Sequence, residues 1–309
     1  MTEDEKFMSR CLQLARCGVA SASPNPMVGA VIVAADRIIG EGFHRRAGEA
    51  HAEVNAFCSV READESLLPS ATMYVSLEPC SHFGKTPPCA DLIIRKGIRR
   101  VVVGCTDTFS KVNGEGIRRL SDAGIDVSVG VLESECRWIN RKFFTFHAKN
   151  RPFVTLKWAQ TADGFLDKGG QSYAISSPFT QMLVHRLRAE HDAIVVGRVT
   201  EEREHPRLDV RHWAGKSPHK YVLSSDFTID SLFADCCERQ YLSLMVEGGR
   251  ATLQSFIDCN LFDEIRIETA PMEVSCGTPA PQLPEGLRLV STETFDNRKI
   301  EVFSAFEAC

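Results

Sequence analysis

Hydrophobic residues in the first half of the chain alternate between the period of a helix and that of a strand. Phe7, Cys11 and Leu14 follow helical spacing behind a capping-box pattern formed by Thr2 and Glu5. Apolar runs bounded by turn residues predict strands over 28–34, 37–43, 72–77, 99–105 and 125–130. Helical patterns between them predict helices over 51–63, 89–97, 114–124 and 132–147. Strands that alternate with helices predict a three-layer α/β domain with a partly parallel sheet.

The same alternation starts again after a polar stretch, AKNRP, at 148–152, where Pro152 ends the preceding helix. Here the pattern predicts strands over 153–159, 192–197, 220–224, 242–249, 263–269 and 300–306, and helices over 178–190 and 250–258. A chain of 309 residues is longer than a single core usually supports. We therefore expect two α/β domains, residues 1–148 and residues 149–309.

Composition and charge narrow the class of protein. The chain is 43% hydrophobic and 25% charged, with a net charge of −5, and its basic residues form short pairs but no sustained stripe. This pattern disfavours a nucleic-acid surface. The N-terminus lacks the apolar segment of a signal peptide, and no apolar run reaches the roughly 20 residues that span a bilayer. We therefore expect a cytoplasmic protein, without membrane or nucleic-acid partners, whose twelve cysteines are reduced or bind metal.

Three residues form a pattern that is typical of a catalytic zinc site. His51 opens a predicted helix in the motif His-Ala-Glu, Cys80 follows a predicted strand, and Cys89 opens the next helix. One imidazole and two thiolates suit zinc, and three protein ligands leave one tetrahedral position for water. Zinc lowers the pKa of this water, so hydroxide is available at neutral pH. We therefore predict one zinc ion per chain.

Glu53, two residues after His51, is the predicted proton carrier. From the same helical turn it can take the proton of the water and pass it to a leaving amine. The arrangement corresponds to the zinc-deaminase signature, H-x-E followed by P-C-x-x-C. It differs in that eight residues, instead of two, separate Cys80 from Cys89.

Other interpretations use the same residues. A structural zinc site would take a fourth ligand from His44 or His82, and the chain would then be a zinc-stabilised interaction protein without catalysis. A nucleic-acid-editing deaminase would need a basic groove and stacking aromatic residues, which the net charge of −5 and the aromatic content of 8% disfavour.

Longer stretches resemble the bifunctional deaminase/reductase family of riboflavin biosynthesis. They are SPNPMVGAVIV (23–33), GFHRRAGEAHAE (42–53), LEPCSHFGKTPPCADLIIRKGIRRVVVG (77–104), RPFVTLKWAQTADG (151–164), VHRLRAEHDAIVVGR (184–198), HPRLDVR (205–211) and VEGGRATLQSFI (246–257). The resemblance implies zinc-dependent hydrolytic deamination of 2,5-diamino-6-ribosylamino-4(3H)-pyrimidinone 5′-phosphate, followed by NADPH reduction of the ribosyl group to a ribityl chain. It also implies a cytidine-deaminase-like α/β/α domain before a dihydrofolate-reductase-like α/β domain. We expect this phosphoribosyl-pyrimidine as the small-molecule partner and a homo-oligomeric assembly.

The resemblance also implies roles for residues of the deaminase half. His51, Cys80 and Cys89 correspond to the zinc ligands, and Glu53 corresponds to the proton shuttle. The positions that correspond to substrate contacts are Asn25, His44, His82, Lys85 and Asp107. Phe109 differs from the family pattern, which usually has an asparagine there.

In the reductase half, the positions that correspond to substrate contacts are Ser172, Arg188, Leu208, Arg211 and Glu247. The two arginines would hold the phosphate, and Glu247 the ribose hydroxyls. The positions that correspond to NADPH contacts are Ala159, Ala174, Thr200, Glu204, Gly249, Arg250, Ala251, Thr252, Leu253, Gln254 and Ser255. Ala174 stands in place of a tryptophan, and Glu204 stands in place of an aspartate. The segment 212–246 is short for the family, which suggests that it lacks a strand. The alternative is therefore an active deaminase with a degenerate, mainly structural reductase domain.

Overall fold

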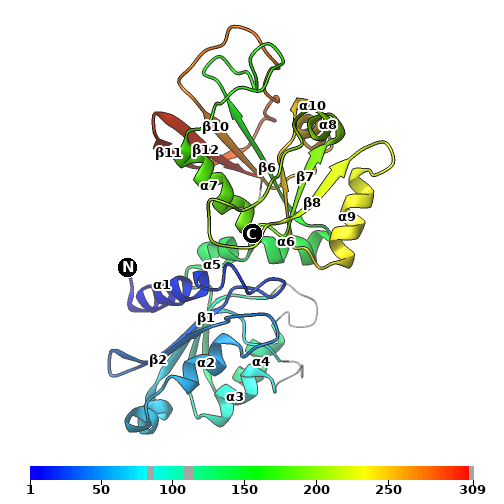
Figure 1. Cartoon of the computed structure of the whole chain (residues 1–309). Helices are drawn as coiled ribbons and strands as arrows, with labels where there is room; N and C mark the ends of the chain where they lie inside the picture. The colour runs from blue at the N-terminus through cyan, green and yellow to red at the C-terminus, as the bar shows by residue number, and fades with distance from the viewer. Residues whose placement is uncertain (82–86, 108–113, 306–309) are drawn as a thin grey trace. The chain divides into compact units, whose positions relative to one another are not determined.

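The computed structural model describes residues 1–81, 87–107 and 114–305, and the chain divides into two compact units (Figure 1). The first unit is Met1–Lys149, and the second begins at Asn150. Each unit has its own mixed sheet and its own hydrophobic core. The α/β class predicted for both halves is confirmed.

Five strands form the sheet of the first unit, in the order β2-β1-β3-β4-β5. They are β1 (Gly29–Ala34), β2 (Arg37–Phe43), β3 (Thr72–Leu77), β4 (Arg100–Cys105) and β5 (Asp126–Val129). Strand β1 runs antiparallel to β2 and β3, whereas β3, β4 and β5 are parallel. Because β3 and β4 are parallel, the segments that follow them leave the sheet at the same edge.

Helices cover both faces of this sheet. They are α1 (Glu3–Arg16), α2 (Ala52–Cys58), the 3-10 helix η1 (Glu62–Ser70), α3 (Cys89–Arg95), α4 (Glu115–Asp122), α5 (Glu133–Ile139) and α6 (Arg141–Lys149). The predicted capping box of Thr2 and Glu5 is present at the start of α1. Helices α1 and α5 contact the central strands, and α2 contacts β1 and β2. Residues of β1, β3 and β4, such as Ile32, Val75 and Val103, form a core with residues of α2, α3 and α4.

Two predicted helices of this unit are wrong in extent. The helix predicted over 51–63 ends at Cys58, because the Ser59 hydroxyl donates to the Ala56 carbonyl and accepts the Glu41 N–H of β2. The helix predicted over 132–147 is two helices, separated at Asn140. The Asn140 side chain accepts the Met27 N–H at 2.8 Å and donates to the Met27 carbonyl at 2.9 Å.

Seven strands form the sheet of the second unit, in the order β11-β12-β10-β6-β9-β7-β8. They are β6 (Phe153–Gln160), β7 (Ala193–Gly197), β8 (His219–Leu223), β9 (Ser243–Val246), β10 (Glu264–Thr269), β11 (Arg288–Phe295) and β12 (Arg298–Ser304). Strand β12 runs antiparallel to β10 and β11, and the other pairs are parallel. The helices are α7 (Pro178–Ala189), α8 (Arg198–Glu204), α9 (Ile229–Glu238) and α10 (Arg250–Asp258).

Apolar residues lie on both faces of this second sheet. Leu156 and Val195 pack on one face with Phe256 of α10, and Ile194 packs on the other with Val184 of α7. Such strands, buried on both faces, read as continuous apolar runs, which is why β6, β7 and β9 could be predicted. Three elements of this unit were not predicted: β11, α8 and α9. Strand β11 and helix α8 are largely exposed and mostly polar, so they carry little periodic signal. Segment 212–246 contains β8, α9 and β9.

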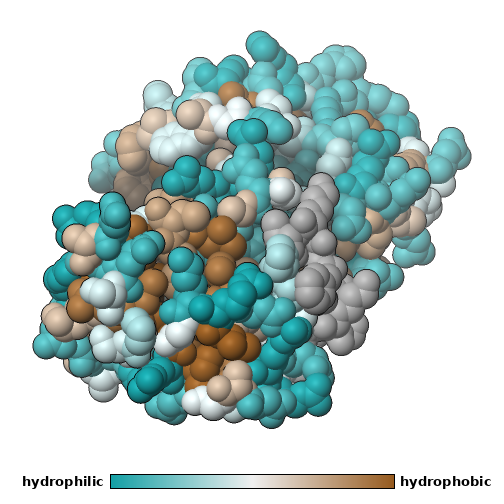
Figure 2. Space-filling view, turned by 90° about the horizontal axis from the view of Figure 1, so that it is seen from below, coloured by the Kyte–Doolittle hydropathy of each residue, from teal (hydrophilic) through white to brown (hydrophobic). Residues whose placement is uncertain are grey.

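Hydrophilic residues cover most of the face shown in Figure 2, around a smaller hydrophobic area. Among the helices of the described residues, none has the length and apolar character needed to cross a membrane.

Candidate active sites

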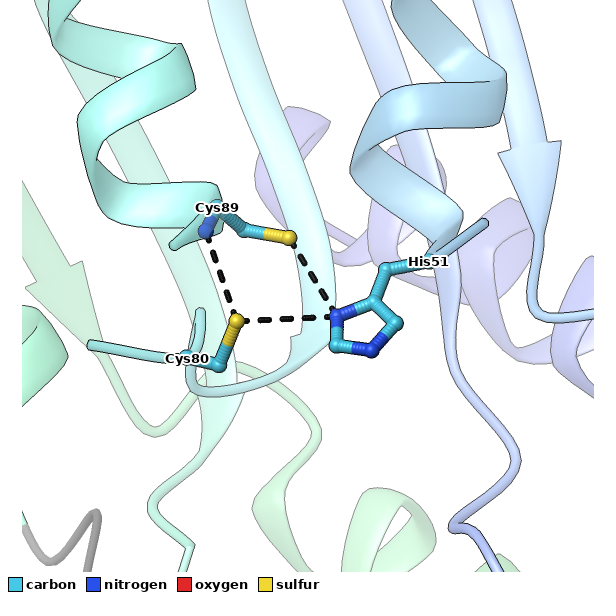
Figure 3. A group of neighbouring side chains, drawn as sticks. All are labelled: His51, Cys80 and Cys89. Atoms are coloured by element: carbon cyan, nitrogen blue, oxygen red, sulfur yellow. Dashed lines mark hydrogen bonds between the residues drawn. The ribbon is translucent and has the colours of Figure 1, made fainter. Parts of the chain in front are cut away.

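His51, Cys80 and Cys89 converge in the first unit, and their side chains point toward one another (Figure 3). The His51 Nδ1 atom lies 3.5 Å from the Cys80 sulfur and 3.4 Å from the Cys89 sulfur. One donor atom from each residue lies within 4.8 Å of the other two. This spacing and this donor set fit a single zinc ion, because all three atoms could reach one centre.

The ends of three elements position this cluster. His51 is the N-cap residue of α2, Cys89 is the first residue of α3, and Cys80 follows β3. The Cys89 N–H donates to the Cys80 sulfur at 3.3 Å, and the Ala90 N–H donates to the Cys80 carbonyl at 3.2 Å. The two cysteines are therefore held together directly, although eight residues separate them in the chain.

The charge state of Cys80 suits metal binding. Hydrogen bonding from the Cys89 thiol, and then from His51, lowers the pKa of the Cys80 thiol well below its ordinary value, in spite of its partial burial. A thiolate is the form in which cysteine binds metal.

Glu53 lies in the first turn of α2, and its side chain is 3% exposed. Burial and the nearby charge of Cys80 raise the pKa of Glu53 to about 7, whereas His51 and a hydrogen bond with Cys89 act in the opposite direction. A carboxyl group with such a pKa can both accept and donate a proton near neutral pH. Its place beside the cysteines is where a proton carrier would be needed.

His44 does not belong to the metal-binding cluster. Its Nε2 atom lies 3.0 Å from the Asn25 side-chain nitrogen, and its Nδ1 atom lies 3.1 Å from the Ala50 carbonyl. Since the Asn25 amide donates, Nε2 accepts and Nδ1 carries the proton of the neutral ring. Burial lowers the pKa of His44, which favours this neutral form. Within the described part of the chain, the only His/Cys/Asp/Glu group suited to a metal is His51, Cys80 and Cys89, so a fourth ligand from His44 finds no support.

Three of the predicted substrate contacts of the deaminase half lie within the described residues: Asn25, His44 and Asp107. Asn25 and His44 are paired, and the His44 ring meets the His51 ring edge to face with centroids 5.6 Å apart. Asp107 follows β4, beside the end of β3 that leads to Cys80. His82, Lys85 and the variant position Phe109 lie outside the described residues.

In the second unit, Arg188 and Glu247 form a buried ion pair. Two nitrogens of the guanidinium each donate to a different carboxylate oxygen at 2.8 Å. Burial alone would raise the pKa of Glu247, but the charges of Lys157 and Arg188 outweigh it, and the pKa lies below its ordinary value. The Arg188 charge is thus already balanced by Glu247.

Asp209 connects this pair with a second arginine. Its carbonyl accepts from Arg188 at 3.2 Å, and its carboxylate accepts from Arg211, whose side chain is 44% exposed. Leu208 is buried next to Asp209 in the chain. The structure therefore brings together four of the five predicted substrate contacts. Ser172 lies in an exposed stretch before α7, and no described hydrogen bond links it with them.

The predicted cofactor residues gather mainly around the N-terminus of α10. The Gly249 N–H donates to the Thr200 hydroxyl at 3.3 Å. A Cβ atom on Gly197 would lie 2.3 Å from the Thr252 hydroxyl oxygen, so the end of β7 and the first turn of α10 need a glycine between them. Gly249 provides no side-chain cap for α10, which leaves N–H groups of its first turn for an anion such as a cofactor phosphate.

The remaining cofactor positions are more scattered. Ala159 lies on β6 opposite Glu268 of β10, Ala174 is exposed before α7, and Glu204 is exposed at the end of α8. The residues from Gly249 to Ser255 form the N-cap and the first turns of α10.

Three polar residues that organise these sites were not predicted from the sequence: Glu78, Asn140 and Asp209. Glu78 accepts hydrogen bonds from backbone N–H groups, Asn140 bonds Met27, and Asp209 joins the two arginines. In the sequence, Glu78 and Asn140 stand out only as polar residues within an apolar pattern. Such a pattern could not reveal a partner, because the partners are backbone groups distant in sequence.

Comparison with known proteins defines the class. The family model described as "Cytidine and deoxycytidylate deaminase zinc-binding region" matches residues 1–105, and the "RibD C-terminal domain" matches residues 152–236 and 226–300. The chain is therefore a bifunctional enzyme in which a zinc-binding deaminase domain precedes a reductase domain.

Relatives identify the family. "Riboflavin biosynthesis protein RibD" of Aquifex aeolicus (strain VF5) is 36% identical, over 97% of this chain and 95% of that protein. RibD of Bacillus amyloliquefaciens is 33% identical, over 92% of this chain and 88% of that protein. The chain belongs to the RibD family of riboflavin biosynthesis proteins.

A solved structure agrees with this assignment. The crystal structure of a diaminohydroxyphosphoribosylaminopyrimidine deaminase/5-amino-6-(5-phosphoribosylamino)uracil reductase from Thermotoga maritima has a TM-score of 0.90 and 32% identity, and covers 98% of each chain. The resemblance drawn from the sequence, the predicted fold class and the bifunctional enzyme class are confirmed.

Proposed function

We propose that this chain deaminates 2,5-diamino-6-ribosylamino-4(3H)-pyrimidinone 5′-phosphate and then reduces the ribosyl group of the product with NADPH. The observation that carries the first step is the cluster of His51, Cys80 and Cys89 beside the buried Glu53. The solved Thermotoga maritima relative, named for both activities, supports the pair of steps.

In the deamination, His51, Cys80 and Cys89 would hold zinc, which when bound supplies hydroxide from water near neutral pH. Glu53 takes the proton released from the water and gives it to the departing amine. A C–O bond forms at the 2-position of the ring, the C–N bond breaks, and ammonia leaves. Asn25 and His44 hold the ring edge, and Asp107, with His82 and Lys85 outside the described residues, completes the substrate contacts.

In the reduction, the N–H groups at the start of α10, with Thr200 beside them, hold the NADPH, which supplies a hydride to C1′ of the ribosyl group. Glu247 orients the ribose hydroxyls and is itself fixed by Arg188. Arg211 is the more exposed arginine and contacts the phosphate. A proton from solvent completes the reduction as NADP⁺ leaves.

A coupled assay on the zinc-loaded protein tests the proposal. With the diaminopyrimidine phosphate and NADPH, we expect ammonia release followed by NADPH oxidation, and no NADPH oxidation before ammonia appears. The deaminated intermediate, supplied directly, should oxidise NADPH, and faster than NADH. Ammonia release without any oxidation of NADPH would favour the degenerate reductase; no ammonia release would remove the deaminase function.

The homo-oligomeric assembly and the cytoplasmic location expected from the sequence stay predictions. Light scattering after size-exclusion chromatography checks the first.

A further inference from the structure

The Glu78 carboxylate is buried and bonded by backbone groups alone among the described residues. Glu78 directly follows β3, precedes Cys80 by two residues and is 5% exposed. Its Oε2 atom accepts the Asp107 N–H at 3.2 Å and the Gly114 N–H at 3.1 Å. Its Oε1 atom accepts the Gly116 N–H at 2.9 Å and the Ile117 N–H at 3.4 Å.

These four bonds join the segment that follows β3 to the segment that follows β4, and both segments leave the sheet at the same edge. The Glu78 N–H donates to the Cys105 carbonyl at 3.0 Å, so the pairing of β3 with β4 continues to this point. Beyond it, the carboxylate holds Asp107 on one side and the N-terminus of α4 on the other. A carboxylate is favoured there because it satisfies N–H groups that have no partner within the helix and carries a charge opposite to that of the helix end.

Close packing fixes the same contact. A Cβ atom on Gly116 would lie 1.9 Å from the Pro79 carbonyl oxygen, so α4 touches the backbone between Glu78 and Cys80. The N-cap residue of α4 is Gly114, which has no side chain to cap the helix. Glu78 therefore caps α4 from a different part of the chain.

We propose that Glu78 is a positioning residue of the deaminase, which acts on substrate binding by fixing the backbone of Asp107. This inference rests on the proposed function, in which Asp107 contacts the substrate. Cys80 has independent support from the Cys89 and Ala90 N–H groups, whereas the Asp107 N–H bonds to Glu78 itself. Loss of the carboxylate should therefore weaken substrate binding and leave the metal ligands in place.

The test compares Glu78→Gln with wild type in the full-length, zinc-loaded protein. The amide keeps one acceptor oxygen and turns an NH₂ group toward backbone donors, so at least one pair of bonds is lost. We expect the KM of ammonia release to rise about tenfold or more, because hydrogen bonds to charged groups are the strong ones. We expect zinc content to stay at the wild-type value, kcat to change less than KM, and reduction of the directly supplied intermediate to be unchanged.

Glu115→Gln is the matched control, because Glu115 is an exposed glutamate at the start of the same helix and pairs with Arg118. It should behave as wild type in every measurement. A wild-type protein that releases no ammonia would contradict the proposed function and not this inference.

Two results overturn the role of Glu78. One is a Glu78→Gln protein with zinc bound and both KM and kcat within about twofold of wild type, a change too small for a lost charge-assisted bond. The other is loss of zinc, which would show support of the metal ligands. If Glu78→Gln does not fold, Glu78→Asp keeps the charge with a shorter reach, and a raised KM is again expected. Wild-type kinetics in that variant, or its failure to fold, would show that Glu78 serves folding alone.

Discussion

At the scale of single residues, Glu53 and the three metal-binding residues could be predicted from the sequence, whereas other site residues could not. His51, Cys80 and Cys89 could be predicted because each stands at an element boundary with a side chain that has few other uses there, and Glu53 because it follows His51 in the same turn. Glu78 and Asn140 could not be assigned partners, since these lie 36 and 113 residues away in the chain, at Gly114 and Met27. A backbone group carries no residue-specific signal of such a contact.

Glu53→Gln should abolish ammonia release, by a factor of about 100 or more, because the amide cannot carry the proton between water and amine. Zinc content should stay at the wild-type value, since Glu53 is not among the three grouped donors. Ammonia release and metal analysis on the same sample check this. Glu62→Gln, an exposed glutamate of η1, is the control; near wild-type turnover in Glu53→Gln would exclude Glu53 from the mechanism.

At the scale of elements, strands buried on both faces and the capped helix α1 were predictable, because their patterns are local. The interruption between α5 and α6 was not, because its cause is a contact of Asn140 with the segment before β1. That segment holds Asn25, which pairs with His44. A side chain in one helical break thus fixes the backbone beside a predicted substrate residue.

Asn140→Ala should therefore destabilise the first unit by about 1–3 kcal/mol, because the Met27 N–H and carbonyl lose their partners where the side chain was buried. Thermal unfolding of the full chain measures this. The KM for ammonia release should also rise, since Asn25 is two residues from Met27. Unchanged stability together with unchanged KM would contradict the role given to Asn140.

The contact of α1 with β4 should depend on pH. Asp4 of α1 accepts from Arg100 at 2.7 and 3.0 Å and from the Tyr74 hydroxyl at 2.8 Å. Hydrogen bonds from Arg100, the largest effect, lower the pKa of Asp4 despite partial burial. Because the folded pKa lies below the unfolded value, the stabilisation is complete above about pH 4 and is lost as the pH falls further.

Asp4→Asn should accordingly lower stability by about 0.5–1 kcal/mol at pH 7, and the difference from wild type should shrink as the pH falls below about 4 and through the lowered pKa of Asp4. Thermal unfolding across this pH range provides the measurement. Asp122→Asn, at an exposed end of α4, should show no difference at any pH. A constant deficit of Asp4→Asn down to pH 2 would show that its charge is not responsible.

At the scale of the whole molecule, each unit contains a separate candidate site. The grouped metal donors and Glu53 lie in Met1–Lys149, and the Arg188–Glu247 pair lies in the unit that begins at Asn150. The domain order was predictable because the apolar patterns restart after 148–152. The partners of Arg188 were not, because an ion pair with Glu247 spans 59 residues.

Two inactivated variants should therefore complement each other. Glu53→Gln should retain only the reduction, and Arg188→Gln, which leaves Glu247 buried without its guanidinium, should retain only ammonia release. A mixture supplied with the diaminopyrimidine phosphate should oxidise NADPH, after a lag while free intermediate accumulates. Absence of oxidation in the mixture, with both single activities intact, would mean that the intermediate does not pass through solution.

The two direct bonds from the Cys89 and Ala90 N–H groups to Cys80 have a consequence for the stretch between the two cysteines. They hold the two thiols together at the points where the chain leaves β3 and enters α3, independently of the residues between them. We therefore expect the two sulfur donors to keep their places when residues of the intervening stretch are exchanged.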